Sequence, residues 1–400
     1  MKFPACKHPR KATQESKGLT WIAAEPFRLF FFSGAVWSII GVSLWPLFYA
    51  GMLSFYPGIT HARIMMECFG GAFVVGFLGT AGPRMASAPK LSTFELLGLF
   101  ALHTAGGIFH LRLMLEEADR CFIAMLVLLL TGLLIRVVRF RTSAPPPQMV
   151  LALTGLICGI SGTILLRQPD LISSLEMYRF AGLLLYQGLL LPPVLGIGSF
   201  LFPRILGGEF GEPKTAGQQR FKLAGAILAA VLIVVSFFLE AFGSPMAGYL
   251  LRAGTAAVYL LTEVKWRREA ASSPRGSLAT GLFWALGVGW LGMATAGFGY
   301  EHHVGLDHLL YIGGFGLLIL VVASRVLFGH SGELAGFSKI SWTPRLLILM
   351  AVVAATTRAS ADFWPKILIS HHQYAAWTWG LGALIWLVWH RRRFLKQGDD

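Results

Sequence analysis

The sequence predicts an all-α polytopic membrane protein, a bundle of twelve transmembrane helices with both termini in the cytoplasm. Three observations lead to this fold class. Hydrophobic residues make up 55% of the 400 residues, charged residues make up only 14%, and long apolar runs recur along the whole chain. An ordinary globular chain has about 25% charged residues, and about 20 apolar residues cross the bilayer core. The lipid bilayer is therefore the first expected partner.

Turn and charge signals separate the apolar runs, so each run becomes one predicted span. Examples are Pro57-Gly58, the prolines at 145–147 and Gly243-Ser244-Pro245. The predicted spans are residues 27–50, 62–82, 93–113, 120–140, 148–167, 178–201, 221–240, 246–264, 279–299, 307–327, 344–359 and 372–390. They form one domain, 27–390, between a basic N-terminal tail (1–26) and a C-terminal tail (391–400). In the sixth span, Pro192 and Pro193 predict a break or a kink.

The distribution of positive charge predicts the orientation. Most of the 34 Lys and Arg residues lie in the tails and in the even-numbered gaps between spans. Positive residues mark cytoplasmic loops, so both termini are expected inside, in the inner membrane of a bacterium. The net charge of +14 does not predict nucleic-acid binding, because the basic residues form short blocks between spans. The four cysteines form no C-x-x-C motif, which argues against a thiolate zinc site and covalent c-type haem.

Histidines are concentrated at the predicted outer face. Seven of the eleven fall there: His61, His110, His302, His303, His308, His371 and His372. His103 lies two turns deeper than His110 on the same side of the third span. A single histidine at a helix end is often only an interfacial residue. Because imidazole suits haem iron and copper, the set as a whole predicts a haem or copper site near the outer surface.

The second span adds soft donor atoms. His61, Met65 and Cys68 follow each other at i, i+4 and i+7, which places them on one face of a regular helix. His, Met and Cys suit copper, although Met65 and Cys68 are also ordinary core residues. In the eighth span, Arg252 has two interpretations: it faces a haem propionate, or it extends toward the surface.

Three stretches resemble the NnrS family: "EPFRLFFFSGAVWSIIGVSLWPLFYAG" from Glu25, "HARIMMECFGGAFVVGFLGTAGPRM" from His61 and "HLLYIGGFGLLILVVASRVLFGHSGE" from His308. The resemblance implies a membrane protein with haem b and copper, linked to nitric oxide and nitrosative stress. It implies His61 and His308 as ligands, with a small diatomic such as nitric oxide as the bound molecule. Arg63 and Ile64 stand where the family has histidine and glutamate, so His302, His303 and His372 are hypothetical replacements.

Other residues of these stretches have more limited roles. Asp307 and Glu301 are candidate orienters of a ligating ring. His330 is a further candidate metal ligand, but 22 residues of helix, about 33 Å, separate it from His308. It therefore belongs to the opposite face, either as a helix-end residue or in a separate cytoplasmic role. His110, His302, His303, His371 and His372 are candidates by position alone.

Two alternatives to the NnrS interpretation remain open. A twelve-span secondary transporter without a redox cofactor fits the broken sixth span and the charges at Glu67 and Arg252. A haem–copper oxidase or nitric oxide reductase subunit also has twelve spans, but its histidine spacing is not found here. The sequence fits both a metalloprotein that only binds its ligand and an oxidoreductase, and it names no redox partner.

Overall fold

The computed structural model describes residues 19–206, 208, 211–264, 266 and 276–396, and these residues contain helices and no strand. Residues 1–18 of the predicted N-terminal tail lie outside the described residues. The first half comprises α1 (Leu19–Ala24), α2 (Phe27–Tyr49), α3 (Gly58–Arg63), η1 (Ile64–Gly70), α4 (Gly71–Met85), α5 (Thr93–Leu111), α6 (Leu115–Ile135), η2 (Arg136–Phe140), α7 (Met149–Leu166), η3 (Leu171–Ser173), α8 (Leu175–Leu183), η4 (Leu184–Gly188) and α9 (Leu191–Ile205).

The second half is helical as well. It comprises α10 (Ala216–Phe242), α11 (Pro245–Glu263), α12 (Ser277–Phe298), η5 (Tyr300–His302), α13 (His303–His308), η6 (Leu309–Gly316), α14 (Leu317–His330), α15 (Leu334–Phe337), α16 (Trp342–Ala361), η7 (Pro365–Ile367) and α17 (Leu368–His390). We call a run of consecutive helical elements a rod. Each rod takes the number of the predicted span that it covers. Three rods matter below: the second (α3, η1, α4), the sixth (α8, η4, α9) and the tenth (η5, α13, η6, α14).

Ten helical stretches of the described residues are long and apolar enough to cross a membrane. They include the second, sixth and tenth rods, Gly58–Met85, Leu175–Ile205 and Tyr300–His330. The prediction of a multi-pass helical protein is therefore confirmed. The helices at the predicted eighth and twelfth spans, α11 and α17, are not among the ten. The count of twelve spans and the cytoplasmic placement of both termini remain predictions.

Local sequence sets where the helices begin. The Ser92 side chain accepts from the Glu95 amide, and the Glu95 carboxylate accepts from the Ser92 amide, a reciprocal cap at the start of α5. Ser174, Thr215 and Ser244 cap α8, α10 and α11, each by a side-chain oxygen that accepts from a backbone N–H of the first turn. The sixth rod is interrupted at residues 189–190, where Pro192 and Pro193 occupy the first turn of α9.

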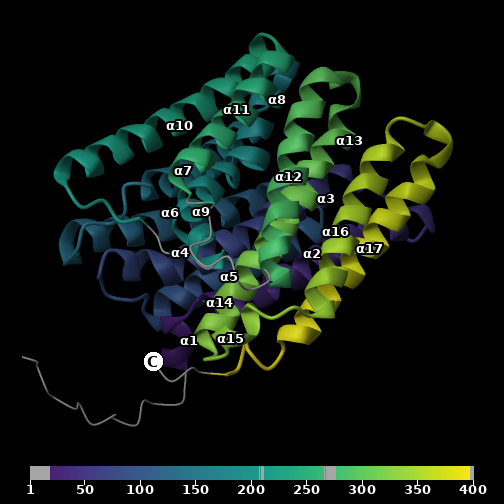
Figure 1. The fold of residues 1–400 in the computed structure, drawn as a ribbon. Coiled ribbons are helices and arrows are strands. Elements are labelled where there is room, and N and C mark those ends of the chain that lie inside the picture. Colours follow the sequence, from purple (N-terminus) through teal and green to yellow (C-terminus); the bar gives the residue numbers. More distant parts are fainter. Residues whose placement is uncertain (1–18, 207, 209–210, 265, 267–275, 397–400) are drawn as a thin grey trace, which may run out of the picture.

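Glycines let the helices approach closely. A Cβ atom added to Gly289 of α12 would lie 3.0 Å from the Cα of Gly314 in η6, so the two backbones touch. In Figure 1, α12, α16 and α17 stand side by side, and α17 also packs on α2. The short helices α1 and α15 lie at one end of the bundle, and α13 lies at the other end (Figure 1).

Each of the three named rods contains a π-helical segment: η1, η4 and η6. π-Helical turns are rare and occur mostly as short interruptions of α-helices, often at functional sites. One further π-helical segment, η2, ends the α6 rod. The three segments in the second, sixth and tenth rods surround the cavity described next.

Candidate metal and cofactor site

A cavity of about 350 Å³ opens between the second, sixth and tenth rods, with α2, α16 and α17 completing its wall. We call it the histidine cavity because His61, His308 and His372 all line it. These residues come from three separate helices, α3, α13 and α17. Its volume lies in the range of pockets that take cofactors and small ligands.

The hydrogen bonds of the three rings leave one nitrogen available on each. The Nδ1 atom of His61 donates to the Gly41 carbonyl at 2.9 Å, and that of His308 donates to the Val304 carbonyl at 2.6 Å. Because a carbonyl only accepts, Nδ1 carries the hydrogen in both rings and Nε2 keeps its lone pair. This is the form in which histidine binds a metal, with the second nitrogen held by a backbone acceptor.

His372 completes the set. Its Nδ1 lies 2.9 Å from the Tyr49 hydroxyl, and its Nε2 is buried without a hydrogen-bond partner among the described residues. When Nδ1 donates to the Tyr49 oxygen, the Nε2 lone pair is free. A buried nitrogen without a partner is costly, so this atom points to a missing ligand.

Close approach of α2 positions His61. A Cβ atom on Gly41 would lie 2.9 Å from the Met65 sulfur, so any larger residue there would push on the Met65 side chain close to the bonded His61 ring. The Trp45 ring of α2 lies 6.0 Å from the His61 ring and 5.1 Å from the His372 ring, centroid to centroid. Trp45 thus contacts two of the three histidines and fixes their orientation.

Two arginines and three tyrosines also line the histidine cavity: Arg179, Arg358, Tyr56, Tyr186 and Tyr311. Arg358 pairs with Asp362 at 2.6 Å through one terminal nitrogen. Arg179 is more heavily engaged, because the Glu240 carboxylate accepts from it twice. Sequence reasoning missed both arginines. A charged residue within an otherwise apolar span was the available signal.

Asp307 also lines the cavity, but its carboxylate does not orient His308. It accepts from the Tyr249 hydroxyl at 2.8 and 2.9 Å, while the Val304 carbonyl holds the His308 ring. Tyr249 in turn accepts from Arg179 at 3.0 Å. Arg252 bonds Glu240 at 2.5 Å and does not line the histidine cavity. These residues form one hydrogen-bonded network that reaches the cavity wall at Arg179 and Asp307.

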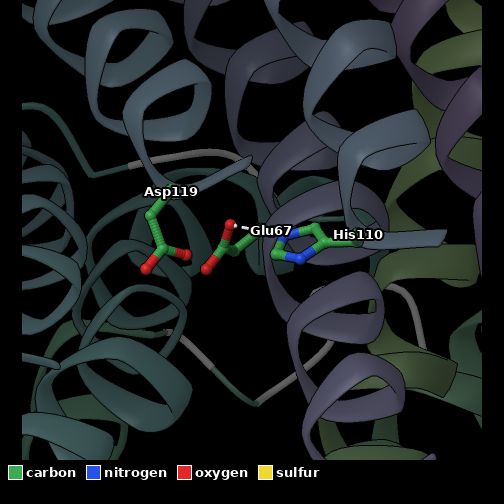
Figure 2. Close-up of side chains that lie close together, drawn as sticks. All are labelled: Glu67, His110 and Asp119. Carbon is green, nitrogen blue, oxygen red and sulfur yellow. Dashed lines mark hydrogen bonds and ion pairs between the residues drawn. The ribbon is translucent and has the colours of Figure 1, made fainter. Parts of the chain in front are cut away.

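A second cluster of possible ligands lies where the second rod meets α5 and α6. Ligand atoms of Glu67, His110 and Asp119 lie within 4.8 Å of one another, and all three residues are buried (Figure 2). His110 Nε2 lies 3.0 Å from the Glu67 carboxylate, and His110 Nδ1 has no partner among the described residues. Arg63 bonds Glu67 at 2.7 Å and lies 3.5 Å from Asp119. A guanidinium group therefore already balances part of the negative charge here.

The remaining candidate residues divide between these two places and the surface. Met65 lines the histidine cavity, whereas Cys68 and His103 line a small cavity beside Glu67 and His110. The π-helical turn of η1 places Met65 and Cys68 on different sides, unlike the regular helix that the spacing assumed. His302 packs on Phe363, His303 stacks on Tyr300, and neither lines the histidine cavity. His371 also lies outside it.

His330 lies far from the histidine cavity, at the end of α14. Its Nδ1 is 2.6 Å from the Glu25 carboxylate, and Arg84 lies 3.2 Å from its Nε2. Burial alone would raise the pKa of Glu25, but His330 and Arg28 outweigh this effect and lower it from 4.5 to about 2. The ring is thus engaged in an ion-pair network rather than free for a metal.

The fold and the site together define a class: a multi-pass helical membrane protein with a histidine-lined cavity between its helices. The chain belongs to the NnrS family, because the family model described as NnrS protein matches residues 21–397, nearly its whole length. This match confirms the resemblance that the three sequence stretches indicated. A search of the curated proteins finds no match to this chain. Nothing in these findings supports the transporter alternative.

Proposed function

We propose that the protein holds haem b, and with it copper, in the histidine cavity and binds nitric oxide there. One observation carries the proposal: three histidines from separate helices present free Nε2 atoms to one cavity. Family membership supports it, since the NnrS family is associated with haem, copper and the response to nitric oxide. The protein would act in the inner membrane of a bacterium.

The donor set fits haem and copper. His61, His308 and His372 would hold the metals between them, with the Met65 sulfur beside His61 as a soft donor for copper. Arg358 lines the same cavity and donates to Asp362 through only one of its nitrogens. Its other N–H groups can therefore donate to a haem carboxylate. When bound, haem would supply a redox-active iron that coordinates a diatomic gas.

The protein's own residues would control access and orientation. The aromatic walls, among them Trp45, Phe69 and Trp379, keep the cavity largely apolar. An apolar wall excludes ions and admits an uncharged diatomic. The Gly41 and Val304 carbonyls hold the ring tautomers in which Nε2 is the ligand atom.

The Glu67, His110 and Asp119 cluster is a weaker place for copper. Two of its three groups are carboxylates, and Arg63 already binds one of them. Copper favours imidazole and sulfur donors, and a metal ion would have to displace a bonded guanidinium. We therefore assign copper, like haem, to the histidine cavity and assign the cluster to holding the second rod against α5 and α6.

A spectrum tests the proposal directly. Protein purified in detergent from haem-replete cells should show a Soret band, reduced-minus-oxidised b-type features, and iron and copper by elemental analysis. Adding nitric oxide to the reduced protein should shift the Soret band. A colourless preparation free of iron and copper would refute the proposal.

A further inference from the structure

The second, sixth and tenth rods enclose a second pocket at their other end. It has a volume of about 790 Å³, and the residues 143–147 and 212–219 contribute to its rim. Each rod places one arginine on its wall: Arg84 from α4, Arg204 from α9 and Arg325 from α14. We call it the arginine pocket. Phe27 at the start of α2 and His330 at the end of α14 also line it.

Two of the three arginines pack over aromatic rings and bond no carboxylate among the described residues. The Arg204 guanidinium lies 3.7 Å from the Phe200 centroid, and that of Arg325 lies 5.6 Å from the Phe337 centroid. Both side chains are partly buried, and their like charges repel each other, while Glu212 attracts the charge of Arg204. A partly buried cation whose charge is only partly balanced is unfavourable unless an anion binds to it.

Buried and partly buried arginines elsewhere in the bundle are different. Arg63, Arg179 and Arg252 each bond a carboxylate at 2.9 Å or less. At the arginine pocket, Arg84 contacts Glu25 and His330, and Glu212 is the acidic residue of the wall. Of the described residues that line the pocket, three are arginines and one is a glutamate, so this part of the wall keeps an excess of positive charge.

We infer that the arginine pocket binds a phosphate group. The guanidinium fork matches phosphate oxygens in pairs, and stacking on an aromatic ring holds the fork in place before the anion arrives. The pocket is larger than a phosphate needs, so the group would be carried on a bigger molecule. That molecule is either an anionic phospholipid headgroup or a soluble phosphate compound. This inference is independent of the haem and copper proposal.

The test compares two probes with purified full-length protein. Inorganic pyrophosphate represents the soluble source, and its binding is measured by titration calorimetry. Phosphatidylglycerol, compared with phosphatidylcholine, represents the lipid source, and its retention is measured by native mass spectrometry. Binding of pyrophosphate identifies a soluble ligand. Retention of phosphatidylglycerol alone identifies a lipid headgroup.

The double variant R204Q/R325Q should weaken binding of the active probe at least about tenfold, since it removes two charged donors. The control R345Q alters an exposed arginine near the start of α16 that does not line the pocket. The affinity of this variant for the same probe should stay within about twofold of wild type. Without ligand, the double variant should melt no lower than wild type, because the mutual repulsion is gone.

Two results would overturn the inference: neither probe binds wild-type protein, or R204Q/R325Q binds as tightly as wild type. If the double variant does not fold, the single variant R325K decides. It keeps the charge but loses the fork, so its affinity should fall severalfold. Unchanged affinity in R325K would count against the inference.

Discussion

The second, sixth and tenth rods carry a cavity at each end, and the two cavities present different side chains. The histidine cavity offers imidazole nitrogens among aromatic walls, and its charged groups are paired: Arg179 with Glu240 and Arg358 with Asp362. The arginine pocket offers guanidinium groups, and Arg204 and Arg325 bond no carboxylate among the described residues. The first chemistry suits a metal centre and the second suits an anion.

An apolar layer separates the two cavities. A small cavity of about 70 Å³ lies between them, sharing Leu190 with the histidine cavity and Phe77 with the arginine pocket. Its wall is apolar, with Phe31, Phe73 and Leu318 among its residues. Ions do not readily cross such a layer. We therefore expect a change at one end to leave binding at the other end unaltered, and the predictions below test this separation.

The largest effect is expected for Glu67→Gln. This change leaves Arg63 buried with only the 3.5 Å contact to Asp119, and breaking a buried ion pair costs about 3–5 kcal/mol. The free energy of unfolding in mixed micelles measures the loss. The control Glu116→Gln alters an exposed carboxylate that pairs with Arg120 and Arg167, and should cost under about 1 kcal/mol. Normal stability with loss of copper in Glu67→Gln would instead make the cluster a metal site.

His308→Ala should empty the histidine cavity while the fold remains. The variant loses a proposed ligand atom, so its iron and copper affinity should fall by more than about a hundredfold, or about 2.7 kcal/mol. Elemental analysis and the Soret band measure this loss. The matched control is His302→Ala in the same segment, whose ring packs on Phe363 outside the cavity. Equal loss in both variants would show that the segment matters only for folding.

Tyr49→Phe tests the support of His372. The change removes one hydroxyl, the partner of His372 Nδ1, and keeps the ring. Loss of such a supporting hydrogen bond typically lowers metal affinity about 10- to 100-fold. Competition with a chelator measures the affinity. Phosphate binding at the arginine pocket should not change, and a parallel loss there would break the separation between the two ends.

The smallest effect concerns acid and Glu25, next to the arginine pocket. Its folded-state pKa of about 2 lies below the ordinary 4.5, so its ion pairs stabilise the protein above pH 4.5. This contribution, about 1 kcal/mol or less after solvent screening, is lost as the pH falls from 4.5 toward 2. Melting temperatures between pH 5 and pH 3 should therefore fall more steeply for wild type than for Glu25→Gln. Parallel slopes would contradict the assignment.

Sequence periodicity predicted much of the fold. The helical bounds follow the predicted spans because apolar runs and prolines are local signals, as at Pro192. Periodicity could not predict the π-helical segments, which depend on packing between rods. For the same reason the expected common face of Met65 and Cys68 does not form.

The candidate site was predictable in part. Enrichment at the outer face indicated His61, His308 and His372, but it could not separate them from His302, His303 and His371, which have the same position along the helices. Only tertiary structure shows which rings line one cavity. The partner of Asp307 was equally hidden, because Tyr249 lies 58 residues away in the chain.

The π-helical segments have a consequence for how this molecule can vary. A π-helical turn holds one residue more than an α-helical turn, and one residue corresponds to about 100° of rotation. In all three rods the residue of the histidine cavity precedes the π segment and the arginine follows it: His61 and Arg84, Arg179 and Arg204, His308 and Arg325. A one-residue deletion within Leu309–Gly316 would thus rotate His308 away from the histidine cavity. Arg325 would still face the arginine pocket. Insertions and deletions in these short segments can re-aim one end of the protein while conserving the other.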